Sequence, residues 1–187
     1  NVMDEIILDT GEKFRVSIVD AGNPTAFVRA EDLGLKGIEL PATFDQDTQN
    51  KMKLEAIRKK VGYLIRVSGN PSIPKIAFVA PSQDFNTSTG NEIRKDEIDI
   101  VARVMAMGKM HKAFAITAGI PTAAAAVIPG SIVQEVIGST QGETVVKKVM
   151  IGHPSGKFEV EVEARREGKQ VHILRCTVGR TARKIME

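Results

Sequence analysis

The uncharged stretch from Ala113 to Ile128 places the strongest constraint on how this chain can fold. It is rich in alanine and β-branched residues and contains one proline, Pro121. A proline suits the first turn of a helix, where its missing N–H leaves no hydrogen bond unmade. A helix that is apolar on every side belongs inside a domain. We therefore expect a small-residue turn at Thr117-Ala118-Gly119, followed by a buried helix that ends near Ile128.

The start of this helix is a candidate anion site. The first turn of a helix carries backbone N–H groups without intrahelical acceptors and about half a positive charge, and small residues leave those groups open to a ligand. Two cationic candidates, His111 and Lys112, stand just upstream. The alternative is a buried helix behind an ordinary glycine-containing turn, and these residues alone leave both interpretations open.

Composition narrows the class of protein. The 187 residues are 42% hydrophobic and 26% charged, which is ordinary for a globular chain with a real core. The net charge is +3, the charges are interspersed, and there is one Tyr and no Trp, so we expect no nucleic-acid partner. A small anionic ligand fits this balance. No apolar run reaches the roughly 18 residues of a membrane-spanning helix, so no membrane partner is expected either.

The single cysteine, Cys176, excludes an internal disulfide and a multi-cysteine metal site, and it is consistent with a reducing, cytoplasmic compartment. It lies in step with Leu174 and Val178, as a small buried hydrophobe on a strand would. The chain begins Asn-Val-Met-Asp-Glu, which does not resemble a signal peptide. We expect residues 1–187 to be one domain from a longer protein.

The first half of the chain alternates strand and helix signals. Apolar alternation and turn residues predict a hairpin of residues 5–8 and 14–19 and a strand at 25–29. The longest helix is expected within 46–67, capped by Asp45 or Asp47, because Leu54, Ile57, Val61 and Leu64 form one apolar stripe. A strand is expected at 75–80 and a loop at 82–91.

The second half predicts further helices and then strands. Ile98, Val101, Ala102 and Met105 recur at helical spacing, so an amphipathic helix is expected over 95–107. Ser131 can cap a short helix that reaches Ile137. Strands are expected at 145–151, 157–164 and 170–178, with a continuation at 183–186. This order predicts an α+β fold with mostly antiparallel strands around a buried helix.

Two turns offer neutral hydrogen-bond donors. Asn23 precedes a proline, which favours an extended backbone and frees the amide for a ligand. Ser155 stands in Gly152-His153-Pro154-Ser155-Gly156, whose glycines let the backbone approach a ligand closely. Both turns are equally typical of ordinary hairpin loops, with a satisfied histidine in the second.

Together these groups suit a carboxylate-rich small molecule. The candidate binding residues are Asn23, His111, Lys112, Thr117, Ala118, Gly119 and Ser155. The three histidines are too scattered for a metal site, and neither a metal nor a cofactor is expected. No acid/base pair accompanies the donors, so no catalytic residue is assigned and the chain looks like half of a site.

Four segments in order resemble the second half of the 2-methylaconitate cis-trans isomerase (PrpF) family. They are Asp20–Val28, Met107–Ala115, Ile151–Gly156 and Gly179–Glu187. The resemblance implies a diaminopimelate epimerase-like fold: two pseudo-symmetric halves, each a curled, barrel-like β-sheet around a central helix, with substrate between them. The helix after Gly119 would be the central one, its first turn would hold a substrate carboxylate, and Asn23 would reach the ligand.

The resemblance also implies a reaction. Such isomerases move a proton along an allylic tricarboxylate without cofactor, which places this chain in the methylcitrate cycle of propionate catabolism. In the epimerases the turn matching Thr117-Ala118-Gly119 carries a catalytic cysteine, which is absent here. The lysine and cysteine proposed as catalytic in the isomerases lie in the other half, so we expect this chain to bind substrate and to be inactive alone.

Three alternatives stay open. One is tautomerisation of a related polycarboxylate such as oxalomesaconate, and another is a non-catalytic protein that binds a polycarboxylate or a partner enzyme. The third is a globular domain without a site at Thr117–Gly119. The expected partners are a small polycarboxylate and the other half of the protein. An isolated half would expose its cleft face, so self-association to a homo-oligomer is plausible on physical grounds.

Overall fold

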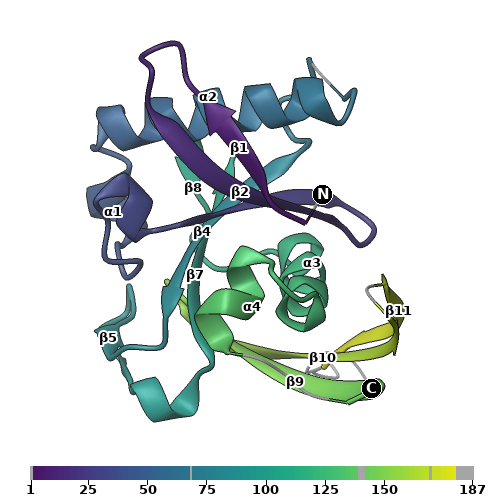
Figure 1. Ribbon diagram of the computed structural model, residues 1–187. Coiled ribbons are helices and arrows are strands. Elements are labelled where there is room, and N and C mark those ends of the chain that lie inside the picture. Colours follow the sequence, from purple (N-terminus) through teal and green to yellow (C-terminus); the bar gives the residue numbers. More distant parts are fainter. Residues whose placement is uncertain (1, 68, 139–141, 169, 180–187) are drawn as a thin grey trace, which may run out of the picture.

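The computed structural model describes residues 2–67, 69–138, 142–168 and 170–179. Nine of the described strands form one mixed sheet in the order β1-β2-β3-β4-β7-β9-β10-β11, with the short β8 beside β7 (Figure 1). These strands are β1 (Asp4–Ile7), β2 (Lys13–Asp20), β3 (Pro24–Arg29), β4 (Lys75–Pro81), β7 (Ile100–Ala106), β8 (Lys109–Met110), β9 (Thr144–His153), β10 (Gly156–Glu167) and β11 (Gln170–Val178). The β3–β4 and β7–β9 pairs are parallel and the other pairs of this sheet are antiparallel, which confirms the mixed α+β class.

Helices cover both faces of the central strands. The helical segments are η1 (Glu31–Leu33), α1 (Pro41–Phe44), α2 (Thr48–Leu64), η2 (Lys95–Glu97), α3 (Ile116–Val127) and α4 (Ile132–Ile137). The buried residues of α3 and α4 belong to one hydrophobic cluster and those of α1 and α2 to another. The β9–β11 strands bend beneath α3, so α3 contacts β2 and β3 as well as these three strands (Figure 1).

The sheet is curved but open. Its path begins at β1 and ends at β11, and these two strands do not pair with each other. The barrel-like closure expected from the sequence is therefore not found in the described part of the chain. The central helix is enclosed on several sides by a sheet whose described strands end at two edges, β1 and β11.

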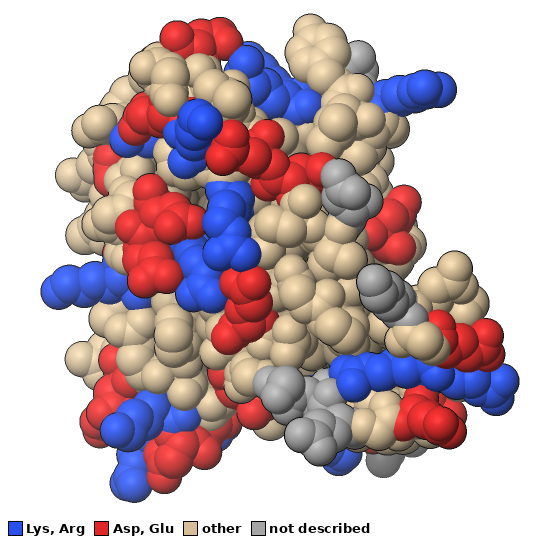
Figure 2. Space-filling model, viewed as in Figure 1, with Lys and Arg blue, Asp and Glu red and all other residues tan. Residues whose placement is uncertain are grey.

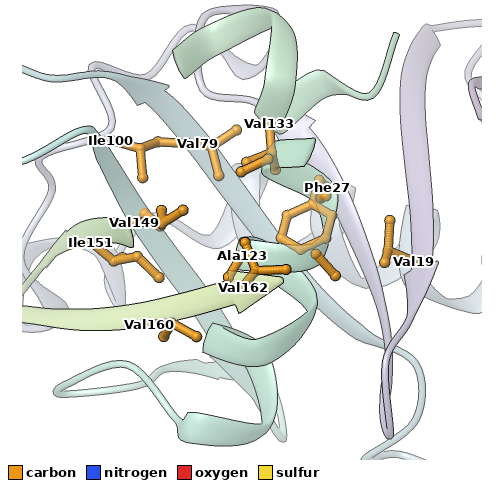
Figure 3. Packing of buried hydrophobic residues seen from close by; sticks show 14 of the residues in the cluster. Val19, Phe27, Val79, Ile100, Ala123, Val133, Val149, Ile151, Val160 and Val162 are labelled. Atoms are coloured by element: carbon orange, nitrogen blue, oxygen red, sulfur yellow. The ribbon is translucent and has the colours of Figure 1, made fainter. Parts of the chain in front are cut away.

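The α3 helix is the centre of one core. Ala123, Ala124, Ala125 and Ala126 have no exposed surface, which confirms the buried helix expected from the sequence. Figure 3 shows Phe27 of β3 and Val162 of β10 lying near Ala123. Short side chains let the strands approach the helix closely on all sides.

The start of α3 differs from the expectation. The helix begins at Ile116, so Thr117-Ala118-Gly119 is its first turn rather than a preceding loop, and Pro121 lies inside it. Because proline has no backbone N–H, the Thr117 carbonyl lacks the hydrogen bond that another residue at position 121 would donate. Because Thr117 is exposed, that carbonyl lies where water can satisfy it.

The helix expected over 95–107 is wrong. Apart from η2, this segment forms β7, a central strand that is buried on both faces. Ala102 and Val104 belong to the α3 cluster, whereas Val101 and Met105 belong to the α2 cluster. A strand with apolar residues on both faces shows no two-residue alternation, and its continuous run also fits a helical spacing.

Both helix caps are confirmed. The Asp47 carboxylate accepts the N–H of Asn50 at the start of α2, at 3.0 Å. The Ser131 hydroxyl accepts the N–H of Gln134 at the start of α4, at 3.1 Å. Each oxygen satisfies a donor that has no acceptor inside its own helix.

The strands expected at 145–151, 157–164 and 170–178 are confirmed as β9, β10 and β11, with one irregularity in β11. A bulge in β11 opposite Glu163 and Ala164 turns Leu174 outward, whereas Cys176 and Val178 pack against the core, so the stripe expected from Leu174 to Val178 is interrupted. The expected loop at 82–91 contains β5 (Phe85–Asn86), which pairs with β6 (Glu92–Ile93). The strand expected at 183–186 lies outside the described residues.

Charged side chains of both signs are mixed over the face shown in Figure 2, as the interspersed sequence predicts. Among the described residues, none of the helices combines the length and apolar character that a bilayer crossing requires.

Candidate functional site

The β9–β10 turn meets the segment that leads into α3. The Ser155 hydroxyl donates a hydrogen bond to the Lys112 carbonyl, which joins positions 43 residues apart in sequence. The His111 N–H donates to the Val104 carbonyl at 2.9 Å and so fixes this segment to β7. Lys112 is exposed beside the joint. The structure therefore brings three sequence-predicted residues, His111, Lys112 and Ser155, into one neighbourhood.

The hydroxyl of Ser155 is used inside the protein. Its O–H donates to Lys112, so toward a ligand the side chain offers oxygen lone pairs rather than the free donor expected from the sequence. Its clear role is to hold the turn against the approach to α3. Direct substrate binding by Ser155 stays a prediction.

The first turn of α3 offers different donors from those expected. The N–H groups of Ala118 and Gly119 donate to the Ala115 carbonyl at 2.8 and 2.9 Å. The N–H groups of Ile116 and Thr117 precede the first intrahelical bonds, and no described residue accepts from them. Thr117 is exposed whereas Ala118 and Gly119 are buried, so the end of the helix at Ile116 and Thr117 is what faces outward.

Gly119 is required where it stands. A Cβ there would lie 2.5 Å from Cζ of Phe158 on β10. The Phe158 ring also lies 6.1 Å from the Phe114 ring and 5.7 Å from the His153 ring, measured between centroids. Phe158 thus connects the first turn of α3 with the β9–β10 turn through direct packing.

His153 is the buried histidine of this neighbourhood. Its Nδ1 accepts the N–H of Ser155 at 3.2 Å, and 9% of its surface is exposed. Burial, followed by the charges of Arg103 and His111, lowers the pKa of His153 to about 4. The imidazole is therefore neutral at physiological pH.

Asn23 stands apart from this group. It lies in the β2–β3 turn, where its carbonyl accepts from the Thr25 hydroxyl at 3.2 Å. Its side-chain oxygen is buried and has no partner among the described residues. No described hydrogen bond connects Asn23 with His111, Lys112 or Ser155, so its role toward a shared ligand stays a prediction.

Arg103 lies fully buried on the face of β7 that is opposite to α3. Its Nε donates to the Glu39 carbonyl at 2.7 Å, its Nη1 donates to the Gly152 carbonyl at 3.3 Å, and its guanidinium lies 5.2 Å from the Phe85 ring centroid. Desolvation lowers the pKa of Arg103 to about 10, so it remains charged. No carboxylate among the described residues forms an ion pair with Arg103, which is unusual for a buried cation.

Sequence reasoning missed both Arg103 and the part that His153 plays. Arg103 fell inside the expected amphipathic helix, whose polar face would have placed it in solvent. A strand assignment would have flagged it, because an arginine within an otherwise apolar central strand must be buried. Nothing in the sequence indicates which ring nitrogen of His153 accepts a hydrogen bond.

A groove of about 620 Å³ lies elsewhere, along the outer side of α2. Its lining includes Met52 and Tyr63, and its carboxylates are already paired, Asp9 with Lys60 and Glu55 with Arg58. It offers no converging set of free polar groups. The neighbourhood of α3 is therefore the stronger candidate site.

The groups described around α3 are suited to binding an anion. Backbone donors at Ile116 and Thr117, the Lys112 cation and the neutral imidazole of His153 suit a carboxylate. Among the described residues, no three His, Cys, Asp or Glu side chains gather where they could hold a metal ion. Cys176 is half-buried on β11, and burial raises the pKa of its thiol, which makes it a poor nucleophile.

Known proteins resemble this chain over its whole length. A 2-methyl-aconitate isomerase of Shewanella oneidensis is 32% identical over 194 residues, covering 100% of this chain and 48% of the relative. A 3-methylitaconate isomerase of Eubacterium barkeri is 38% identical, covering 100% of this chain and 50% of the relative. The crystal structure of a methylitaconate-delta-isomerase matches with a TM-score of 0.84 at 37% identity, over 100% of this chain and 48% of that one.

The chain spans about half the length of these relatives. The family model described as PrpF protein matches residues 1–187, which include the described fold and every candidate residue named above. This chain belongs to the PrpF family.

Proposed function

We propose that this chain is the C-terminal, substrate-binding half of a cofactor-independent isomerase that moves a proton along an allylic polycarboxylate. The first candidate substrate is 2-methylaconitate. The proposal is carried by one observation: a chain that matches the PrpF family throughout presents the first turn of its buried helix beside Lys112. Two named relatives are 2-methyl-aconitate isomerases, from Shewanella oneidensis and Cupriavidus necator.

In this proposal the chain stabilises charge. Removal of a proton from one end of an allylic system leaves a carbanion whose charge spreads onto the adjacent carboxylate, and the proton returns at the other end. The free N–H groups of Ile116 and Thr117 and the Lys112 ammonium would hold that carboxylate. Fixed donors aimed at developing charge are a large source of rate enhancement.

The acid and base belong to the other half of the protein. The residues assembled around α3 supply donors and one cation, and the lysine and cysteine that the family resemblance implies as the catalytic pair would lie in the other half. The substrate would lie between the two halves, with its carboxylate on this chain and its reacting carbons toward the other. The chain alone would bind substrate without turning it over.

The test compares this chain with the full-length protein on 2-methylaconitate in D₂O. Proton NMR follows both the isomer ratio and the deuterium that enters at the reacting carbon. We expect isomerisation and exchange with the full-length protein and neither with the chain alone. Turnover by the chain alone would contradict the division of labour and would direct attention to His111, Lys112 and Cys176.

A second substrate deserves the same assay. A relative from Novosphingobium sp. named (4E)-oxalomesaconate Delta-isomerase is 29% identical over 174 residues. Running 3-methylitaconate and oxalomesaconate beside 2-methylaconitate would assign the substrate by the highest kcat/KM. Tight binding of a polycarboxylate without turnover of any of the three would instead support the non-catalytic binding role.

A further inference from the structure

The orientation of the His153 ring is fixed by hydrogen bonding and packing. Its Nδ1 accepts the N–H of Ser155 at 3.2 Å, which requires an unprotonated Nδ1 and places the ring proton on Nε2. The edge of the ring packs against Phe158, with 5.7 Å between centroids. Phe158 in turn contacts the first turn of α3 at Gly119.

The proton-bearing nitrogen is the open end of this ring. No described residue accepts from Nε2 of His153. Nε2 is also absent from the fully buried polar atoms that lack a partner in the described part of the chain. The small exposed fraction of His153 therefore includes Nε2, which has no acceptor among the described residues.

The ring of His111, next to the Lys112 carbonyl that Ser155 contacts, is oriented by the same kind of hydrogen bond. Its Nδ1 accepts the N–H of Ala113 at 3.1 Å, so its neutral form also carries the proton on Nε2. The exposed Lys112 follows His111 in sequence, and its carbonyl accepts the hydrogen bond from the Ser155 hydroxyl.

A buried cation on the other face of the sheet holds the residue before His153. Arg103 donates through Nη1 to the Gly152 carbonyl and through Nε to the Glu39 carbonyl. Gly152 is closely packed, because a Cβ there would lie 2.8 Å from Cδ1 of Ile98. The backbone at the end of β9 therefore cannot shift without breaking these contacts.

We propose that His153 is a substrate-contacting residue whose Nε2–H donates to a carboxylate of the polycarboxylate, and that Arg103 is the positioning residue that holds it through Gly152. The nature of the ligand rests on the function proposed above. A neutral, preorganised donor binds a carboxylate beside Lys112 and the α3 N–H groups without adding a second buried cation. This role assigns a purpose to both buried groups that the sequence left unexplained.

The decisive experiment measures binding of tricarballylate, a saturated tricarboxylate, to the full-length protein. Imidazole nitrogen NMR follows the histidines, and calorimetry gives the Kd for wild type, His153→Leu, His153→Gln and the control His172→Leu. His172 is an exposed histidine paired with Glu167. We expect tricarballylate to shift the His153 Nε2 signal. We also expect His153→Leu to weaken binding at least tenfold, His153→Gln to stay within about threefold because its amide keeps a donor, and His172→Leu to match wild type.

Two outcomes overturn the proposal. One is a correctly folded His153→Leu protein that binds tricarballylate as wild type does, and the other is a tricarballylate complex in which the His153 signal does not move. Failure of the proposed function looks different: the wild type then turns over none of the three substrates, whereas tricarballylate still shifts His153.

Arg103 is tested through His153. Arg103→Lys keeps a cation but loses the fork that reaches both carbonyls, so KM for the assigned substrate should rise several-fold with kcat changed less than twofold. The His153 signal should also move while that of His172 stays. A protein with altered melting temperature but unchanged KM and unchanged His153 signal would show a purely structural role and overturn this assignment.

Discussion

The two helices that cover opposite faces of the sheet are buried by different means. The α2 helix buries one stripe of large side chains, Leu54, Ile57 and Val61, and keeps its outer side in solvent. The α3 helix is surrounded and buries mostly alanine. Large side chains of α2 fill its interface with the sheet, whereas at α3 the strands themselves approach the helix closely.

This difference explains where the candidate site lies. An amphipathic helix can shift on its sheet because its outer side is free, whereas α3 is enclosed by β2, β3 and β9–β11. A helix end that must hold a ligand group accurately benefits from that enclosure. The two helices should therefore respond to opposite kinds of substitution.

The largest effect is expected from removing atoms under α2. Leu54 has no exposed surface, so Leu54→Ala should lower the free energy of unfolding by about 3 to 4 kcal/mol through lost burial and the cavity left behind. Met52 lies on the outer side and is 68% exposed, so Met52→Ala is the matched control and should change stability by less than about 0.5 kcal/mol. Urea unfolding measures both, and equal losses would contradict the one-sided packing of α2.

A slightly smaller effect is expected from adding atoms to α3. Ala124→Leu inserts bulk where no space is left and should lower the free energy of unfolding by about 2 to 3 kcal/mol. Ala56→Leu is the control on α2, where Ala56 borders the surface groove and the added atoms can extend into it. If both substitutions proved neutral, α3 would not be closely packed.

Sequence reasoning succeeded where local signals act alone. Asp47 and Ser131 cap their helices as expected, because a cap needs only a short side chain and the next turn. The β9–β10–β11 meander follows from alternation and tight turns. The buried character of α3 follows from its uncharged composition.

Sequence reasoning failed where contacts between distant segments decide the local structure. The β7 strand is apolar on both parities because helices cover both sides of the sheet, and that arrangement cannot be read from residues 95–107 alone. The start of α3 was misplaced because Pro121 can stand inside a helix when the residue whose carbonyl it leaves unbonded, Thr117, is exposed. The bulge at Leu174 shifts the strand phase without any glycine or proline to mark it.

Three of the candidate site residues lie together in the structure, but the sequence did not indicate their geometry, and their role toward a ligand stays a prediction. His111, Lys112 and Ser155 were identified from motifs, and the structure shows that the serine holds the lysine carbonyl. Arg103 acts from the far side of the sheet, which no local pattern records. The contribution of Asn23 stays a prediction.

The two faces of the sheet should lose stability at different pH values as the pH is lowered. The folded pKa of His153, about 4, lies below its ordinary value of 6.5, so between these pH values the unfolded chain takes up a proton that the folded chain does not. Stability contributed by His153 is therefore complete above pH 6.5 and falls as the pH drops toward 4. At about 1.4 kcal/mol per pH unit, with an allowance for the ring's open edge, we expect a loss of about 2 kcal/mol.

The α2 face should respond only at lower pH. The hydrogen bond from the Asn50 backbone lowers the pKa of Asp47, and the hydrogen bond from Arg58 lowers that of Glu55. The stability that these carboxylates contribute is present above their ordinary pKa values and is lost as the pH falls through their lowered ones. Urea unfolding at pH 7, 5.5 and 4.5 should show a decline that His153→Gln reduces, and an unchanged decline in that variant would contradict this account.

The smallest effects are expected at the two caps, and they should still differ. Ser131 is fully buried and its hydroxyl also donates to the Ala125 carbonyl at 2.6 Å, which ties the start of α4 to the end of α3. Ser131→Ala leaves the part-buried Gln134 N–H without its acceptor and leaves the Ala125 carbonyl with only the Ile128 N–H, at 3.2 Å, so it should lower the free energy of unfolding by about 2 kcal/mol. Asp47 lies near solvent, which can replace its carboxylate, so Asp47→Ala should lower it by about 1 kcal/mol or less. Thermal unfolding at pH 7 compares the two variants, and a larger loss for Asp47→Ala would mean that enclosure by the sheet does not set how strongly each helix depends on its cap.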